Sequence, residues 1–261
     1  MFGCREKVQI PWDKPYILLE GEGSKYTVIE WNDCENIDKP AFGAYADNFV
    51  AKYIGFLNTC NKGHTLETRK RAVAAQIAGD KSAFYECSFY GLQDTLYDKF
   101  GRHYFKSCYI EGAVDFIFGH GQSIYESCNI NVTAGTSLQP GVAGFITANG
   151  RDSKKENTGF VFKHCSVFGT GTTYLGRAWG SYSRVLFYQS DLSNVVVPQG
   201  WDAWLFVNHE ETITYAEYDC RGSGSNTVGR VPWETKMDLQ TVNYFADMSY
   251  IDPEGWLKKQ P

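Results

Sequence analysis

A short pattern of apolar and polar positions recurs along this chain. An aromatic residue is followed three positions later by Cys or Ser, and two positions further on by an apolar or aromatic residue. In each unit apolar and polar residues alternate, and the unit ends at Gly, Asn or Asp. This pattern is typical of strands joined by turns. Steps of 27, 21, 20, 37 and 25 residues separate the anchors. The units are 85–89, one residue shorter before its cysteine, then 105–110, 125–130, 162–167 and 187–192, with an earlier relative at 54–60.

A repeat of about twenty residues is too short for a propeller blade and predicts a solenoid whose coils stack strand on strand. The longest step contains residues 133–144, which we expect to form a loop that projects from one coil. Segments 14–21 and 212–218 also read as strands. Helical spacing of apolar residues over 238–250, with Pro253 and Gly255 beyond it, predicts a short C-terminal helix. No linker interrupts the chain, so we expect one all-β domain over 1–261.

Stacked coils would place the recurring cysteines above one another as small buried side chains. Neighbouring rungs lie about 4.8 Å apart, a spacing that also permits a disulfide. We expect mostly free thiols among the eight cysteines. None forms a CxxC pair, and the five histidines are scattered, so the sequence predicts no metal site.

Composition excludes several classes of function. The formal net charge of −5 argues against a nucleic-acid surface or an anionic membrane surface. The chain contains no run of 18 apolar residues, and residues 1–15 are too polar for a signal peptide. An anionic substrate would have to meet a local basic groove.

Two aspartates occupy equivalent places in consecutive units. Asp94 and Asp115 are 21 residues apart and each follows a cysteine by seven residues. In a parallel solenoid both carboxyl groups would share one face, where repulsion of about 3 kcal/mol, or about two pKa units, would keep one protonated. An ionised carboxylate beside a carboxylic acid is a competent pair for hydrolysis. Asp is also common in turns, but burying two acids in apolar runs without a function would be costly.

The ionised member of such a pair needs a cation, and Arg177 in Leu-Gly-Arg-Ala-Trp is the candidate, because a guanidinium can hold a carboxylate through two hydrogen bonds. Gln93 could donate a hydrogen bond to a developing oxyanion. Three aromatic residues could stack on sugar rings or belong to the core, namely Trp179, Tyr97 and Phe118.

Together these segments resemble the pectin methylesterases, especially the plant type. The matching stretches are 92–97, 112–119 and 175–179, in the family's order and at similar separations. Further matches are 79–85, Trp201-Asp-Ala-Trp204 and 255–257, so the resemblance covers nearly the whole chain. It implies a single-stranded right-handed parallel β-helix.

The resemblance also implies a function, the hydrolysis of methyl esters on homogalacturonan with release of methanol and without a cofactor. By analogy Asp115 is the nucleophile, and Asp94 is the acid and then the base. Gln93 stabilises the oxyanion, Arg177 orients Asp115 and contacts substrate, and Trp179 lines a sugar subsite. The implied setting is the extracellular cell wall, for a monomer that a proteinaceous pectinesterase inhibitor could bind, with no nucleic-acid or membrane partner.

Three departures from the family pattern stand out. Arg71 occupies the place of a second glutamine of the oxyanion hole, and loss of one such donor can cost about 10²–10³ in rate. Milder differences are His120-Gly-Gln after the nucleophile segment and Ala178 in place of Pro. The chain begins inside the family pattern, so we expect the usual signal peptide, first strand and first helix to be missing.

Other readings remain open at this point. Arg71 and the short N-terminus motivate a catalytically impaired relative that only binds pectin. The tripeptide 119–121 is shared with polygalacturonases, but no accompanying acid pair is present, and a pectate lyase would need a calcium-binding acid cluster that the sequence lacks.

Overall fold

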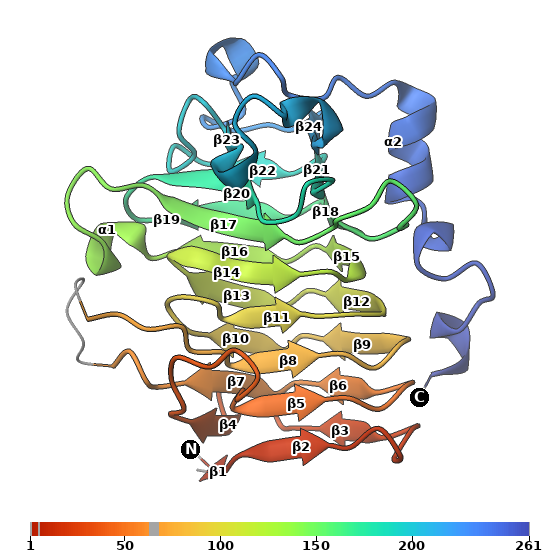
Figure 1. The fold of residues 1–261 in the computed structure, drawn as a ribbon. Helices are drawn as coiled ribbons and strands as arrows, with labels where there is room; N and C mark the ends of the chain where they lie inside the picture. Colours follow the sequence, from red (N-terminus) through yellow and green to blue (C-terminus); the bar gives the residue numbers. More distant parts are fainter. Residues whose placement is uncertain (1, 5, 63–67, 261) are drawn as a thin grey trace.

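The computed structural model describes residues 2–4, 6–62 and 68–260 and shows a parallel β-helix, as the repeat predicts (Figure 1). Within the described residues, each coil contributes one strand to each of three parallel sheets. The first sheet contains β1 Phe2–Cys4, β4 Thr27–Trp31, β7 Gly55–Asn58, β10 Ser88–Tyr90, β13 Tyr109–Gly112, β16 Asn129–Val132, β19 Ser166–Gly169 and β22 Asp191–Leu192.

The other two sheets are built in the same way from successive coils. The second contains β2 Val8–Ile10, β5 Phe42–Ala44, β8 Ala75–Ile77, β11 Leu96–Asp98, β14 Val114–Gly119, β17 Gly144–Asn149, β20 Thr173–Ala178 and β23 Trp201–Asp202. The third contains β3 Leu18–Glu20, β6 Val50–Lys52, β9 Ser82–Tyr85, β12 Arg102–Lys106, β15 Gln122–Glu126, β18 Gly159–Lys163, β21 Arg184–Tyr188 and β24 Thr214–Tyr218.

The predicted aromatic ladder runs along the inside of the third sheet. Phe105 is fully buried and stacks on its counterparts in both neighbouring coils, with ring centroids 5.0 Å from Phe84 and 4.6 Å from Tyr125. Phe162 and Phe187 continue the stack at 4.6 and 4.5 Å. Stacked rings in register pin each coil on the next, because a slip by one residue would turn every ring to the solvent face.

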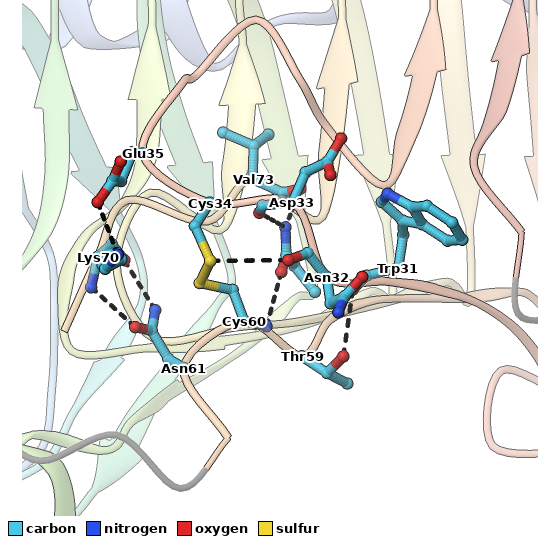
Figure 2. Close-up of a disulfide and its surroundings, with 11 residues drawn as sticks. Trp31, Asn32, Asp33, Cys34, Glu35, Thr59, Cys60, Asn61, Lys70 and Val73 are labelled. Carbon is cyan, nitrogen blue, oxygen red and sulfur yellow. Dashed lines mark hydrogen bonds and ion pairs between the residues drawn. A yellow bond between two sulfur atoms is a disulfide. The ribbon is translucent and has the colours of Figure 1, made fainter. Parts of the chain in front are cut away.

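The register corrects two details of the repeat. Phe105 pairs with Phe84, so the aromatic anchor of the first unit is Phe84 and not Tyr85, and that unit is not shorter. Ser88 pairs with Gly55, which makes Ile54 the counterpart of Cys87. Cys60 therefore does not belong to the ladder. It forms a disulfide with Cys34 instead (Figure 2).

The local backbone conformation explains why cysteine recurs at these positions. The residue before each one adopts a left-handed conformation that turns the chain from the third sheet into the first. The thiol of the next residue then donates to a carbonyl of the preceding coil, as Cys108 does to Phe84 and Cys165 to Tyr125. Ser190 makes the same contact with Phe162 through its hydroxyl. The left-handed residues are Glu86, Ser107, Ser127, His164, Gln189 and Asp219.

The expectation of mostly free thiols is confirmed for the described cysteines. Besides the one disulfide, the free thiols are Cys87, Cys108, Cys128, Cys165 and Cys220. The side chain of Cys4 lies outside the described part of the structure.

The C-terminal segment covers the outer face of the third sheet (Figure 1). Helix α2 spans Leu239–Ala246 and is capped by Asp238, whose carboxylate accepts the backbone N–H of Thr241. The expected helix of 238–250 is thus divided, because the Asp247 carboxylate accepts the N–H of Ser249 and starts the separate turn η4, Met248–Tyr250. Buried Phe245 and Trp256 pack in the cluster on this face.

The remaining helices are short and lie in loops. Helix α1, Ala134–Ser137, falls in the loop that the 37-residue step predicts. The others are 3₁₀ turns, namely η1 Trp204–Phe206, η2 Glu210–Thr212, η3 Thr227–Gly229 and η5 Leu257–Lys259. None of the described helices is long and apolar enough to cross a membrane.

We expect Phe105→Ala to lower the free energy of unfolding by about 3–5 kcal/mol, because it opens a cavity and breaks the ring stack on both sides. Phe100→Ala makes the same chemical change at a ring that is 52% exposed, and should cost less than about 1 kcal/mol. Chemical denaturation followed by circular dichroism measures both. Equal losses in the two variants would contradict the stabilising role of the ladder.

Candidate active site

The two aspartates enter the second sheet one coil apart. Leu96 of β11 pairs with Ile117 of β14, so the 21-residue spacing of Asp94 and Asp115 is one full coil. Both aspartates have left-handed backbones, with φ of 60° and 48°, a conformation that Asp tolerates better than most residues. Their side chains are buried, yet both line a cleft of about 220 Å³ on the outer face of this sheet.

Arg177 of β20 binds Asp115 through two hydrogen bonds. Its Nε lies 2.8 Å from Oδ1 of Asp115, and its Nη2 contacts Oδ2. The guanidinium is held between two rings, with its Cζ 4.2 Å from the ring centroid of Phe145 and 3.8 Å from that of Trp204. A planar guanidinium held between two rings fixes the orientation of the carboxylate that it binds.

The electrostatic environment separates the two acids. Burial, and then the charge of Asp115, raises the pKa of Asp94 to about 8, against the opposing charges of Arg71 and Arg177. Burial also raises the pKa of Asp115, but the hydrogen bonds and charge of Arg177 oppose that shift. At neutral pH the arrangement therefore favours a protonated Asp94 beside an ionised, oriented Asp115. Repulsion between the two acids, which the spacing predicts, contributes to the raised pKa of Asp94, but burial is the larger cause.

Aromatic side chains form one side of the cleft. Phe118 and Trp179 line it, with ring centroids 6.0 Å apart. Tyr97 stacks on Phe118 with ring centroids 4.3 Å apart and is not among the residues that line this cleft, so its contact with the site is through Phe118. His120 packs edge-on against Trp179 at 5.0 Å.

Gln93 and Arg71 complete the set of predicted residues in the cleft. Gln93 is half-buried, forms a bridge with Val114 and accepts the backbone N–H of Ala72. Arg71 is exposed and lies one coil before the aspartates. Among the described residues, no three His, Cys, Asp or Glu side chains gather in a way that could hold a metal ion.

Comparisons with known proteins decide the family. The family model described as Pectinesterase matches residues 3–254. The chain belongs to the pectinesterase family. It is 51% identical over 262 residues to probable pectinesterase 29 of Arabidopsis thaliana, covering 98% of this chain and 78% of that protein. Probable pectinesterase 55 of the same plant is 50% identical, with 98% and 79% covered.

Solved structures agree with this assignment. The pectin methylesterase from carrot matches with a TM-score of 0.91 at 32% identity, covering 99% of this chain and 84% of that one. A pectin methylesterase from Aspergillus niger matches with a TM-score of 0.84 at 27% identity, covering 100% and 85%. The fold is thus the right-handed parallel β-helix of the pectinesterases, which are carboxylic ester hydrolases acting on pectin. The alternatives of a polygalacturonase or a pectate lyase are not supported.

Three lining residues of this pectinesterase site were not predicted, Ile37, Ala148 and Trp204. Trp204 stands in the segment Trp201-Asp-Ala-Trp204, so its signal was present in the sequence without a role attached. Its left-handed backbone is stabilised by Asp202, whose Oδ1 accepts the N–H of Trp204 at 2.6 Å. Ile37 lies in a loop before β5 and carries no signal that distinguishes it from an ordinary apolar residue.

Proposed function

We propose that this pectinesterase demethylesterifies homogalacturonan with Asp115 as the nucleophile. The observation that carries the proposal is the pairing of Asp115 with Arg177 beside Asp94, whose pKa of about 8 keeps it protonated at neutral pH. A carboxylate that is ionised and oriented can attack, and a neighbouring carboxylic acid can protonate the leaving group.

The first half of the reaction forms an acyl-enzyme. A carboxylate oxygen of Asp115 attacks the ester carbonyl carbon, and Gln93 donates a hydrogen bond to the resulting oxyanion. Arg71 is a second donor within the same cleft. When the tetrahedral intermediate collapses, the carbon–methoxy bond breaks and Asp94 gives its proton to the departing oxygen. Methanol leaves, Asp94 is ionised, and the substrate acyl group is held on Asp115 as an anhydride.

The second half restores both acids. Ionised Asp94 takes a proton from water, and the hydroxide attacks the acyl carbon. The bond to Asp115 breaks, which regenerates ionised Asp115 beside protonated Asp94 and frees a carboxylic acid group on the polymer, which then loses its proton to solvent. Phe118, Trp179 and Trp204 offer faces against which sugar rings can pack.

We further propose that the enzyme works outside the cell, in the plant cell wall where its polymer lies. The disulfide between Cys34 and Cys60 supports an oxidising compartment. Binding of a proteinaceous pectinesterase inhibitor and a monomeric state remain predictions, which co-purification with such an inhibitor and sedimentation would test.

The rate should depend on pH through the two aspartates. Asp94 must be protonated, so kcat/KM for methanol release should fall as pH rises through about 8. Asp115 must be ionised, so the rate should also fall on the acid side. Asp94→Asn should cost about 10²–10⁴ in rate, and its residual activity should lack the alkaline limb. A wild-type rate that still rises above pH 9, after subtraction of enzyme-free ester hydrolysis, would refute the role of Asp94.

A further inference from the structure

A second cavity lies where the C-terminal end of the chain runs beside the first coils (Figure 1). Its volume is about 220 Å³, and it shares no lining residue with the catalytic cleft. One wall comes from the turns that lead into the third sheet, at Tyr16, Asn48 and Lys81. The other wall comes from residues 254–260 of the C-terminal segment. The cavity is therefore a concave site of its own, away from the reacting aspartates.

The turns in the first wall share one backbone conformation. Tyr16, Asn48 and Lys81 are all left-handed, with φ of 62°, 58° and 61°. The N–H of Tyr16 donates to the carbonyl of Asp47, and the N–H of Asn48 donates to the carbonyl of Asp80. Each turn is thus held on the turn of the next coil, so this wall has a fixed backbone.

Ion pairs and a hydrogen bond fasten the second wall to the same coils. Both carboxylate oxygens of Glu254 accept from Nη1 of Arg102 at 2.8 Å, and Glu254 also pairs with Lys81 at 3.2 Å. Hydrogen bonding to Arg102, and then to Lys81, lowers the pKa of Glu254, so its carboxylate is ionised. Nε2 of Gln260 donates to the carbonyl of Lys81 at 2.9 Å. Both walls are therefore in place without a ligand.

The polar groups left in the cavity have no partner among the residues that the structure describes. Oε1 of Gln260 is buried and accepts no hydrogen bond there. The ammonium group of Lys259 and the side-chain amide of Asn48 are likewise uncommitted. Because Lys81 and Glu254 neutralise each other, Lys259 gives the cavity a net positive charge. A buried acceptor beside a cation calls for a ligand that brings both a donor and a negative charge.

An anionic sugar has the groups that these residues need. A carboxylate suits the ammonium group of Lys259, and a hydroxyl group can donate to Oε1 of Gln260. Tyr16 lines the cavity yet is 80% exposed, and its ring offers a face for the C–H groups of a sugar. Sites for drug-sized ligands begin at about 300 Å³, so this smaller cavity suits a single sugar unit.

We propose that this cavity binds one uronic acid unit of an unesterified stretch of pectin, through Lys259, Gln260 and Tyr16. The site lies away from the catalytic cleft and takes no part in the proposed reaction. A stretch of polymer held here raises the local concentration of its other units near the protein. A methyl-esterified unit lacks the carboxylate and binds more weakly.

Nuclear magnetic resonance on the full chain tests this proposal at the cavity itself. Galacturonate, and galactose as the sugar without the carboxylate, are titrated while the indole N–H signal of Trp256, which lines the cavity, is followed. Wild type should bind galacturonate with a Kd on the order of 1 mM and galactose about tenfold more weakly. In Lys259→Gln the two sugars should bind about equally, because the charge that distinguishes them is gone.

Lys258→Gln is the matched control. It removes the same charge from the adjacent lysine, which is exposed and does not line the cavity, and it should keep the tenfold preference. Gln260→Leu removes the buried oxygen and should weaken the binding of both sugars by a similar factor, with the preference retained. The three variants thus separate the contact with the carboxylate from the contact with a hydroxyl group.

Two results would overturn the site. One is a Trp256 signal that does not shift at galacturonate concentrations about tenfold above the expected Kd. The other is a preference in Lys259→Gln equal to that of wild type. Neither measurement involves turnover, so both leave the proposed esterase function untouched. A folded wild type that binds galacturonate in this cavity but releases no methanol from esterified pectin would refute that function alone.

Discussion

Replacing Asp115 by Asn is expected to lower methanol release by on the order of 10⁴-fold or more. An amide is a poor nucleophile, and the change removes the anion that Arg177 holds in place. The substitution preserves shape at a side chain that is 7% exposed, so the β-helix should still form.

Methanol quantified after incubation with highly esterified pectin measures the effect, and circular dichroism checks the fold. Asp13→Asn is the matched control, because it makes the same change at an exposed aspartate outside the cleft and should leave the rate unaltered. A near-normal rate in Asp115→Asn would mean that the nucleophile has been wrongly assigned.

Replacing Arg177 by Gln should be the second most damaging change, with a loss on the order of 10³-fold in kcat/KM at neutral pH. Two charge-assisted hydrogen bonds to Asp115 are lost, and with them the effect that opposes burial. The pKa of Asp115 should rise, so a smaller fraction of the nucleophile is ionised at a given pH. The acid limb of the pH profile should therefore move to higher pH, toward the alkaline limb of Asp94.

The pH profile distinguishes reduced ionisation of Asp115 from a general loss of activity. Arg177→Lys keeps the charge without the planar fork, so it should move the acid limb less while still lowering the maximal rate. An acid limb that stays in place in Arg177→Gln would show that the arginine does not set the ionisation of Asp115.

Periodicity in the sequence predicts the fold because every coil packs equivalent side chains against those of the neighbouring coils. The aromatic and cysteine positions had to stack, and the 21-residue spacing of Asp94 and Asp115 became one coil. The same logic failed where the chain leaves the repeat. Cys60 looks like another rung, but it sits in a loop and is bonded to Cys34. Tyr85 and Phe84 are both aromatic, and nothing in the local sequence distinguishes the inward ring, Phe84, from its neighbour.

The cleft was predicted in part for a similar reason. The positions of residues on or beside the strands follow from the register of the coils. Gln93 and Arg177 accordingly lie in the cleft with the two aspartates. Ile37 and Trp204 reach it from loops, whose course depends on contacts far along the chain. The leading effect on the pKa of Asp94 is burial, which no spacing argument can measure.

The most direct test of the account follows both products of the reaction in one sample. Highly methyl-esterified pectin is incubated with wild type and with Asp115→Asn, while methanol and new carboxyl groups are measured together. The account predicts that wild type forms one carboxyl group for each methanol, without chain cleavage, and that Asp115→Asn forms almost none of either. A folded wild type that releases no methanol, or release by Asp115→Asn at a rate near that of wild type, would contradict it.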